Sequence, residues 1–342
     1  MNIHFITRPD SKYDSKHATK ITPVRGMVSC IIPAFNEHDN LAVLLPELCA
    51  LLEQWCDAWE IIVIDDGSAD KTPELMTHWA RIDGVRYVQL SRNFGKEAAI
   101  AAGLEAADGD AVICLDADMQ HPLALIPNML MRWQAGVEMV YAVRSDRDDE
   151  PWIKRVGTRL FYHLLADTRG VEVPPNAGDF RLMDRKVVDA LLALPERTRF
   201  MKGLYAWVGF RSEAMPYLPE QRRHGVSHYH FFRLLGLAMT GITAFTTWPL
   251  RLVGIAGATF AALSFMYGLY LVGDYLFDGS APSGWTTIVT ALLFFAGVNL
   301  ISLGMIGEYI GRIFDEVKGR PLYVTRQKRG RSRAKRAKAQ AS

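Results

Sequence analysis

The stretch Ala111-Val112-Ile113-Cys114-Leu115-Asp116-Ala117-Asp118 decides the fold. Five apolar residues are followed at once by two carboxylates that stand one residue apart. A short apolar run of this kind is typical of a strand that is buried on both faces, and the carboxylates then stand at its carboxyl end. In open α/β sheets, ligands bind beyond that end of the strands. The stretch therefore predicts a parallel sheet with a site at one edge.

The same alternation continues on both sides of this stretch. Strands are predicted at Met27–Ile32, Glu60–Ile64, Val85–Leu90, Ala111–Leu115 and Met139–Val143. Helices are predicted between them at Asn40–Trp55, Thr72–Ile82, Lys96–Ala107 and Leu123–Trp133. Apolar strands that alternate with helices indicate a sheet covered on both faces, so the predicted fold class is α/β with a mostly parallel, Rossmann-like sheet.

Polar side chains also follow the other predicted strands. They are found in Asn36-Glu37, Asp65-Asp66-Gly67-Ser68 and Arg92-Asn93. We expect these groups to lie close together, because the carboxyl ends of parallel strands meet at one edge of the sheet. No Gly-x-Gly-x-x-Gly follows the first strand, where residues 33–37 stand instead, and this argues against a dinucleotide-dependent oxidoreductase.

The pair Asp116 and Asp118 predicts a site for a divalent cation. Two carboxylates this close repel each other, and a cation that also binds a diphosphate removes the repulsion and neutralises a leaving nucleotide. Gln120 offers a neutral oxygen to the same ion. The alternative is an N-cap, with Asp118 or a neighbour capping the helix that starts near Pro122. The turn that follows Asp65 has the same alternative interpretation, in which Ser68 or Asp70 is the N-cap of the next helix.

Two uncharged stretches lie near the C-terminal end, from Leu252 to Gly273 and from Gly279 to Gly307. At about 1.5 Å per residue, each is long enough to cross a hydrocarbon core of about 30 Å. They predict a hairpin of two transmembrane helices, at about 252–273 and 285–307. Residues 227–249 are mildly apolar, without an acidic residue up to Thr247, and predict an interfacial segment.

The overall charge of +2 hides an uneven distribution. Ten Lys or Arg residues lie between Lys318 and Lys338, with no Asp or Glu among them. We interpret this run as a solvated, disordered tail that also fixes topology and attracts anionic lipid. The segment Asp274–Gly284 has no Lys or Arg, so both chain ends are predicted to be cytoplasmic. Nucleic acid, the competing partner for a basic tail, is not expected.

The remaining composition points to an ordinary intracellular domain. The four cysteines contain no Cys-x-x-Cys pair, which predicts core thiols without zinc or disulfides. Residues 1–26 are polar and basic, and predict a flexible leader rather than a signal peptide. The predicted order is then the leader 1–26, an α/β domain at 27–226, the interfacial segment 227–249, two membrane helices within 250–312 and a basic cytoplasmic tail at 313–342.

Several motifs together resemble the family 2 glycosyltransferases of the GT-A fold. The motifs at the strand ends are residues 29–37 (SCIIPAFNE), 65–68 (DDGS), 92–96 (RNFGK) and 116–120 (DADMQ). Residues 178–183 (GDFRLM), 199–203 (RFMKG) and 307–312 (GEYIGR) narrow the resemblance to the polyprenyl-phosphate glycosyltransferases. Within that group the bactoprenol glucosyltransferases are most similar, and dolichyl-phosphate mannose synthase is more distant. The resemblance covers roughly residues 27–324.

The resemblance implies a role for each matching position. Nucleotide contacts are implied for Pro33, Asn36, Glu37, Asp65, Asp66, Lys96, Arg223 and Ser227. Mg²⁺ or Mn²⁺ would be held by Asp116, Asp118 and Gln120, and the lipid phosphate by Arg144, Lys154 and Arg155. Asp118 and Asp179 stand at catalytic positions. The family pattern has Lys after Ser227, whereas this chain has His228.

For Asp179 the residues leave an alternative open. In that alternative, Asp179 is a structural carboxylate that pairs with Arg181 or a nearby Arg. The implied nucleophile is a phosphate monoester, which is already ionised near neutral pH, so a general base is less necessary than for a hydroxyl acceptor. Asp179 would then orient the sugar or the basic residues.

The implied activity is a metal-dependent, inverting transfer of a hexose from a nucleotide diphosphate sugar to polyprenyl (undecaprenyl) phosphate. UDP-glucose is the first candidate donor, and the implied place is the cytoplasmic face of the inner membrane, in contact with the lipid bilayer. Three alternatives remain: another donor such as GDP-mannose or a modified sugar, a processive polysaccharide synthase, and a non-catalytic nucleotide-binding scaffold. The absence of Gln-x-x-Arg-Trp disfavours the synthase, and the intact carboxylate pair disfavours the scaffold. A homo-oligomer is left open.

Overall fold

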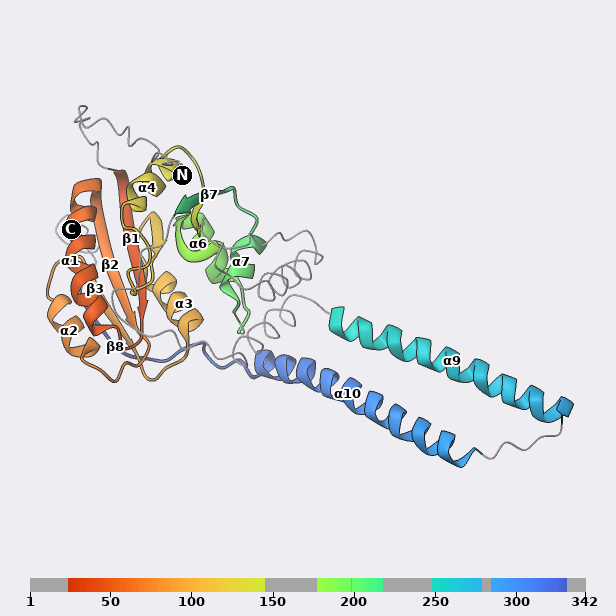
Figure 1. Ribbon diagram of the computed structural model, residues 1–342. Helices are drawn as coiled ribbons and strands as arrows, with labels where there is room; N and C mark the ends of the chain where they lie inside the picture. The colour runs from red at the N-terminus through yellow and green to blue at the C-terminus, as the bar shows by residue number, and fades with distance from the viewer. Residues whose placement is uncertain (1–23, 145–176, 198, 218–247, 279–283, 331–342) are drawn as a thin grey trace, which may run out of the picture.

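The structure is a computed structural model of the 342-residue chain, and it describes residues 24–144, 177–197, 199–217, 248–278 and 284–330. An α/β domain carries two long helices that project away from it side by side (Figure 1). The predicted fold class is confirmed.

One sheet of eight strands forms the centre of the described part of the domain, in the order β7-β5-β6-β4-β1-β2-β3-β8. The strands are β1 Val24–Ala34, β2 Cys56–Asp65, β3 Val85–Leu90, β4 Ala111–Cys114, β5 Met139–Arg144, β6 Ala177–Asp184, β7 Ser212–Tyr217 and β8 Thr325–Arg329. Strands β4, β1, β2 and β3 are parallel to one another, as are β5 and β7.

Strands β6 and β8 run antiparallel to their neighbours. Because β6 is antiparallel to both β4 and β5, those two strands point the same way. The carboxyl ends of β1 to β5 and β7 therefore lie at one edge of the sheet, together with the amino ends of β6 and β8. We call this edge the strand-end edge.

Helices cover both faces of the sheet. They are α1 His38–Trp55, α2 Thr72–Trp79, α3 Lys96–Ala106, α4 Leu125–Gln134, α6 Arg185–Ala193 and α7 Met201–Trp207. On β1, Ile32 belongs to the cluster under α1, α2 and α4, whereas Ile31 belongs to the cluster under α3, α6 and α7. Neighbouring residues of a strand point to opposite faces, so a strand covered on both sides is apolar along most of its length.

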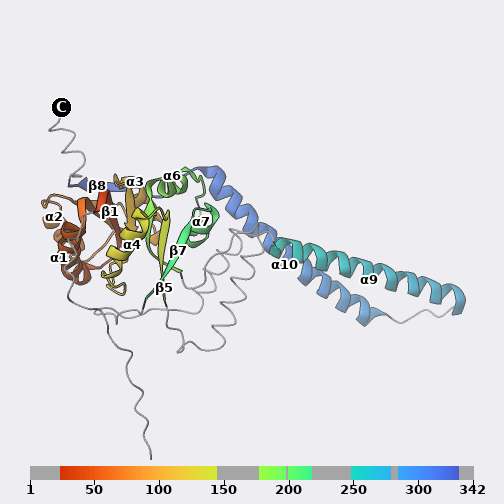
Figure 2. The ribbon, with the colours of Figure 1, turned by 90° about the horizontal axis from the view of Figure 1, so that it is seen from above.

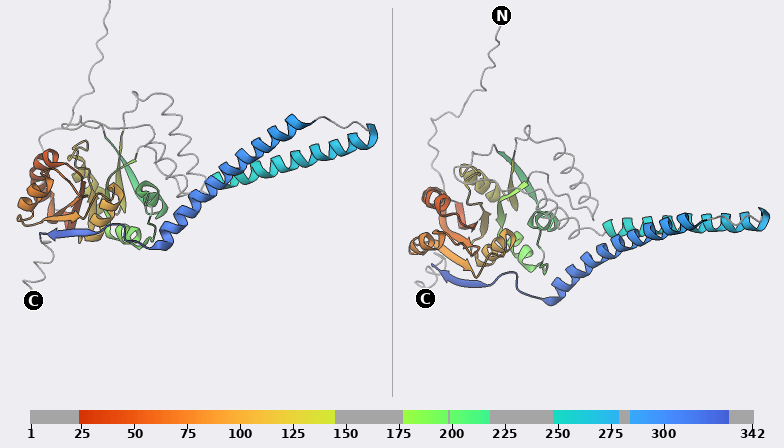
Figure 3. Two further views of the ribbon diagram at one scale, coloured as in Figure 1. Left: turned by 90° about the horizontal axis from the view of Figure 1, so that it is seen from below. Right: turned by 60° about the horizontal axis from the view of Figure 1, so that its bottom comes forward.

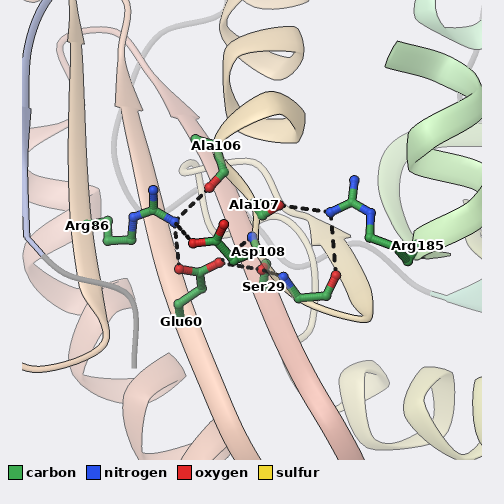
Figure 4. Close-up of polar contacts among 8 residues, drawn as sticks. Ser29, Glu60, Arg86, Ala106, Ala107, Asp108 and Arg185 are labelled. Atoms are coloured by element: carbon green, nitrogen blue, oxygen red, sulfur yellow. Dashed lines mark hydrogen bonds and ion pairs between the residues drawn. The ribbon is translucent and has the colours of Figure 1, made fainter. Parts of the chain in front are cut away.

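A buried polar network ties the sheet to the loop between α3 and β4 (Figure 4). Glu60 is fully buried on β2 and accepts hydrogen bonds from Ser29 Oγ at 2.7 Å and from the guanidinium of Arg86 at 2.8 Å. The same carboxylate accepts from the backbone N–H of Asp108 at 2.8 Å. A buried charge needs such partners, so this network has a structural role, away from the strand-end edge.

Three strands were not predicted from the sequence, and β8 corrects one interpretation. We expected a disordered tail, but Thr325–Arg329 pairs with β3 as an antiparallel edge strand. The physical reason is that an edge strand offers free backbone N–H and C=O groups, and a partner strand needs no apolar pattern to bond to them. Residues 24–26 of the predicted leader likewise belong to β1.

The two projecting helices occupy the predicted places. They are α9 Trp248–Asp278 and α10 Trp285–Lys318, and α10 continues past Gly307, the predicted end. Within them, Leu252–Tyr270 and Phe294–Lys318 are long and apolar enough to cross a membrane, and neither is buried inside the protein. Phe260 on α9 contacts the ring of Phe294 on α10 at 5.4 Å. Figure 2 shows the two helices extending together from one side of the domain.

Candidate active site

Three charged side chains meet at the strand-end edge. Asp116 follows β4, and Asp179 stands near the start of β6, which lies beside β4 in the opposite direction. Lys96 is the first residue of α3. Its Nζ lies 2.7 Å from Asp116 Oδ1 and 2.7 Å from Asp179 Oδ2. The structure thus joins two carboxylates through one ammonium group.

This arrangement shifts the pKa values of Lys96 and Asp179 in the directions that keep both groups charged. Burial alone would lower the pKa of Lys96, but the carboxylates of Asp116 and Asp179 outweigh it and raise that pKa well above its ordinary value. Burial alone would raise the pKa of Asp179, but Lys96, then Arg181 and Lys202, hold it below its ordinary value. Lys96 is therefore a cation and Asp179 an anion at neutral pH.

The loop in front of Lys96 is held by the Asp65–Ser68 turn. Asp66 Oδ1 accepts from the backbone N–H of Phe94 at 2.7 Å, and Asp66 Oδ2 accepts from that of Gly95 at 2.8 Å. Gly67 has φ of 74°, and a Cβ there would stand 2.5 Å from the carbonyl carbon of Arg92. Only glycine fits this close approach. The sequence motifs 65–68 and 92–96 are therefore parts of one structure, and Asp66 positions the loop.

The residues predicted to contact the nucleotide join the loops after β1 and β2. Asp65 is fully buried and accepts from Ser68 N at 2.7 Å and from the hydroxyl of Tyr87 at 2.6 Å. Asn36, with φ of 57°, accepts from Ala69 N at 2.8 Å. These contacts give Asp65 and Asn36 a clear structural role. Their contact with a nucleoside stays a prediction.

The other two predicted nucleotide residues of this region also lie at the carboxyl end of β1. Pro33 is buried within the strand and is the register partner of Ile64 on β2. Glu37 precedes α1, where its backbone N–H donates to Thr72 Oγ1 at 3.1 Å and its carboxylate accepts from Asn40 at 2.6 Å.

A short turn carries the rest of the predicted metal site. Asp118 Oδ1 accepts from the backbone N–H of Gln120 at 3.2 Å, and Met119 between them has φ of 57°. The helix that follows, α4, is preceded by Ala124 and has no side-chain cap. The N-cap alternative for Asp118 is therefore wrong.

His121 is a site residue that sequence reasoning missed. Its ring stacks on Phe180 at 4.9 Å and meets the edge of Tyr217 at 5.7 Å. Burial lowers the pKa of His121, although Asp116 and Asp118 act in the opposite direction. The only sequence signal was its place directly after the 116–120 motif.

The donor chemistry of this turn fits a hard divalent cation. Asp116, Asp118 and Gln120 offer only oxygen atoms, the ligands that Mg²⁺ and Mn²⁺ prefer. In the described ranges, no group of three or more His, Cys, Asp or Glu side chains could hold a metal by itself. A cation here would take its remaining oxygens from water or from a ligand such as a diphosphate.

Further ionisable side chains lie near Asp179. Glu97 accepts from the backbone N–H of Met201 at 3.3 Å, and burial, with Asp179 adding to it, raises the pKa of Glu97 to about 7. Arg181 donates to Gly178 O at 2.6 Å, and its guanidinium lies 3.4 Å from the ring centroid of Tyr205. Among the residues that the structure describes, Asp179 forms its ion pair with Lys96, whereas Arg181 donates to a backbone carbonyl.

The residues predicted to bind lipid phosphate are only partly described. Arg144 ends β5 at the strand-end edge, is exposed and lies opposite Tyr217 of β7 in the register of the sheet. Lys154, Arg155, Arg223 and Ser227 lie outside the described residues, as do the predicted interfacial residues 227–247.

Comparison with known proteins gives matches along most of the chain. The model for glycosyl transferase family 2 matches residues 29–192, and that for the GtrB C-terminal hairpin matches residues 248–313. The uncharacterized glycosyltransferase sll0501 of Synechocystis sp. is 43% identical over 298 residues, which cover 87% of this chain and 94% of that protein. The SfII prophage-derived bactoprenol glucosyl transferase of Shigella flexneri is 40% identical over 301 residues, which cover 88% and 97% of the two chains.

Among solved structures, glucosyl-3-phosphoglycerate synthase from Mycobacterium tuberculosis has a TM-score of 0.48 at 21% identity, and the match covers 64% of this chain and 77% of that one. The matches to the sequence relatives are long enough to include most of the α/β domain and of the helical hairpin. The chain is a glycosyltransferase and belongs to glycosyl transferase family 2.

Proposed function

We propose that this glycosyltransferase transfers a single hexose, with glucose as the first candidate, from a nucleotide diphosphate sugar to polyprenyl phosphate. The observation that carries the proposal is the combination of a carboxylate–ammonium site at the strand-end edge with a hairpin long and apolar enough to cross a bilayer. Support also comes from the Shigella relative, whose name describes glucosyl transfer to bactoprenol. One substrate would arrive from water and the other from the membrane.

In the proposed reaction, an oxygen of the lipid phosphate attacks the anomeric carbon of the sugar. A new carbon–oxygen bond forms while the bond to the nucleoside diphosphate breaks, and the electron pair leaves on the diphosphate oxygen. Attack in line with the leaving group inverts the anomeric centre. The charge that grows on the diphosphate has to be stabilised, and fixed positive groups do this most effectively where water is excluded.

Among the described residues, Lys96 is a cation placed where it would meet that need. Its ammonium is held at the site by Asp116 and Asp179, so it can neutralise negative charge without reorganising. A Mg²⁺ or Mn²⁺ ion bound by Asp116, Asp118 and Gln120 would add the same kind of stabilisation.

In the proposed reaction, Asp179 orients Lys96 and a sugar hydroxyl and does not remove a proton. A phosphate monoester carries its charge near neutral pH before it attacks, so it has little need of a base. The lowered pKa of Asp179 keeps its carboxylate charged, which suits holding Lys96 and a sugar hydroxyl. Arg144, with Lys154 and Arg155, would receive the lipid phosphate, since guanidinium and ammonium groups bind phosphate strongly.

The membrane arrangement follows from the same features. The α/β domain precedes α9, and β8 follows α10 and pairs with the same sheet, so both ends of the hairpin return to one side. The basic residues that follow α10 favour the cytoplasmic side, where sugar nucleotides are made. The inner membrane is the proposed location.

A donor screen tests the sugar assignment. Purified protein in lipid nanodiscs is given a short-chain polyprenyl phosphate and, separately, UDP-glucose, UDP-galactose or GDP-mannose. We expect transfer from UDP-glucose, with one hexose on each lipid. Preference for GDP-mannose would reassign the donor, a ladder of added sugars would favour a processive synthase, and no transfer from any donor would contradict the proposal.

A further inference from the structure

The chain returns to its first domain after the membrane hairpin. Residues 319–324 lead from α10 to β8, which lies along the outer edge of β3 in antiparallel register. Figure 3 shows this segment leaving α10 and running along the edge of the sheet. The C-terminal strand therefore belongs to the α/β domain, although more than 200 residues separate Gln327 from its partner Gln89.

Side-chain hydrogen bonds attach β8 to both β3 and α2. Gln327 Nε2 donates to Gln89 Oε1 at 2.9 Å, and Arg329 donates to Thr77 Oγ1 at 3.1 Å. Tyr323, just before the strand, donates its hydroxyl to Glu105 near the end of α3 and packs against the core cluster under that helix. These contacts reach β3, α2 and α3, so the segment is more than a loosely attached edge.

The last turn of α10 also contacts the domain. The backbone N–H of Arg197 donates to both oxygens of Glu316, at 2.8 and 3.0 Å. The side chain of Arg197 donates to the carbonyl oxygen of Arg320. Arg197 lies in the connection between α6 and α7. The end of the second candidate membrane helix is thus attached to the α/β domain, as β8 is.

The segment reaches the active-site loop through one backbone contact. Ser91 N donates to Val324 O at 2.8 Å. Ser91 stands between β3 and the loop that ends at Lys96, and the far half of this loop is held by Asp66. The loop is therefore fixed from one side by the turn after β2 and from the other by the residue that precedes β8.

The short connection limits how far the site can move from the membrane helix. Only six residues join Lys318 to Thr325. An extended chain spans at most about 3.6 Å per residue, so these residues reach roughly 20 Å at full stretch. A strand paired at the edge of the sheet thereby keeps the loop before Lys96 within a fixed range of the end of α10.

We propose that β8 and the residues before it are a positioning element of the active site. They hold the loop 91–95, and through it Lys96, at a defined place relative to the end of α10. The role given to Lys96 rests on the proposed function. The positioning itself does not, because it is a property of the protein without substrates.

Two truncations of the full chain test this proposal. The first ends at Gly319 and removes Tyr323 and β8. The second ends at Gly330 and keeps both, so it is the matched control. Hydrogen exchange of the detergent-solubilised proteins is followed by mass spectrometry for peptides that cover residues 91–96 and, as an internal reference, residues 28–34 of β1.

We expect the truncation at Gly319 to raise exchange in residues 91–96 by about tenfold or more, with little change in β1. Its kcat should fall by about tenfold or more, because a misplaced Lys96 no longer meets the leaving group. The truncation at Gly330 should match the full chain in both measurements. Unchanged exchange in residues 91–96 without β8 would overturn the proposal, whatever the donor sugar proves to be.

A second pair of variants covers the case in which the shorter truncation does not fold. Tyr323→Phe with Gln327→Ala removes two anchoring side-chain contacts and keeps the strand. Arg326→Ala with Lys328→Ala removes two exposed charges from the same strand. We expect faster exchange in residues 91–96 and a lower kcat only in the first pair. Equal behaviour of the two pairs would contradict positioning by these anchors.

A cross-link tests whether the strand binds its own chain. Gln89→Cys and Gln327→Cys are combined in a chain whose four cysteines are replaced by serine or alanine. The two positions are register partners whose side chains meet, and antiparallel partners have Cα separations that suit a disulfide. We expect a disulfide within one chain. A covalent dimer would place β8 on a second copy and would overturn the intrachain account.

Discussion

The Nζ of Lys96 lies 2.7 Å from the Oδ2 of Asp179, and this ion pair joins the start of α3 to the start of β6. The same ammonium lies 2.7 Å from Asp116. Two carboxylates at the strand-end edge therefore share one cation from a neighbouring helix. The one ammonium compensates only part of the negative charge of the two carboxylates, and removing it should affect both carboxylates at once.

Replacing Lys96 with Met should abolish most of the activity. The change keeps much of the side-chain volume but leaves Asp116 and Asp179 without their cation and the diphosphate without an ammonium. We expect kcat/KM to fall by about 100-fold or more. Lys186→Met is the matched control, since Lys186 also makes a 2.7 Å ion pair, with Glu138, away from the site. Equal activity of the two variants would remove Lys96 from the mechanism.

Asp118→Asn should weaken metal binding and lower the metal-dependent transfer while the fold persists. The amide keeps the shape of the carboxylate but loses its charge, so about 100-fold less transfer is expected at a fixed concentration of Mg²⁺ or Mn²⁺. Activity is measured against metal concentration, and in excess chelator. Asp57→Asn, at an exposed position near the start of β2, controls for the loss of one negative charge. Full activity of the unmodified protein in chelator would rule out the metal site.

Glu97 should make stability depend on pH. Burial raises the pKa of Glu97 from its ordinary value of 4.5 to about 7 in the folded protein. Between these values the folded protein binds the proton more tightly than the unfolded chain does. The stabilisation is therefore fully present below pH 4.5 and is lost as the pH rises through 7.

We expect Glu97→Gln to flatten this pH dependence. Urea unfolding at pH 5.5, 6.5 and 7.5 gives the free energy of unfolding for the unmodified protein and the variant, and their difference isolates Glu97. Glu47→Gln, at an exposed position on α1, is the control. Parallel pH curves for Glu97→Gln and the unmodified protein would show that Glu97 does not titrate in this range.

The strands that were predicted from sequence are those whose burial leaves a pattern. Residues 61–64 of β2 and 111–114 of β4 are apolar throughout because helices cover both faces, and such runs are visible without a structure. Strand β8 has the sequence TRQKR, which no hydrophobic pattern marks. Its strand conformation comes from pairing with the distant β3, so local sequence cannot reveal it. The same holds for β7, which is half exposed at the other end of the sheet.

The sequence motifs identified residues of the candidate site, but they did not reveal which of these residues contact one another. Asp116, Asp118 and Asp179 were identified from their motifs, and Lys96 was assigned to nucleotide binding. The pairing of Lys96 with Asp179 depends on the antiparallel direction of β6, which the sequence did not reveal. The loop-holding role of Asp66 likewise depends on two backbone N–H groups that are 28 and 29 residues away.

The membrane topology can be tested with single cysteines in a chain whose native cysteines are replaced. Gly284→Cys precedes α10 at the end of the hairpin that is remote from the domain, and Asp57→Cys lies in the domain. With intact cells, an impermeant thiol reagent should label Gly284→Cys and should label Asp57→Cys only after permeabilisation. The reverse pattern would place the domain outside the cytoplasm and away from the sugar nucleotides.

The most direct test of the central proposal is the identity of the two products. Purified protein in lipid nanodiscs is incubated with UDP-glucose and undecaprenyl phosphate, and the lipid and nucleotide products are analysed by mass spectrometry. We expect a lipid with one phosphate and one hexose, released together with an equal amount of UDP, and we expect neither from Asp118→Asn. A lipid with two phosphates and released UMP, or no lipid-linked sugar from any nucleotide sugar, would contradict glycosyl transfer to polyprenyl phosphate.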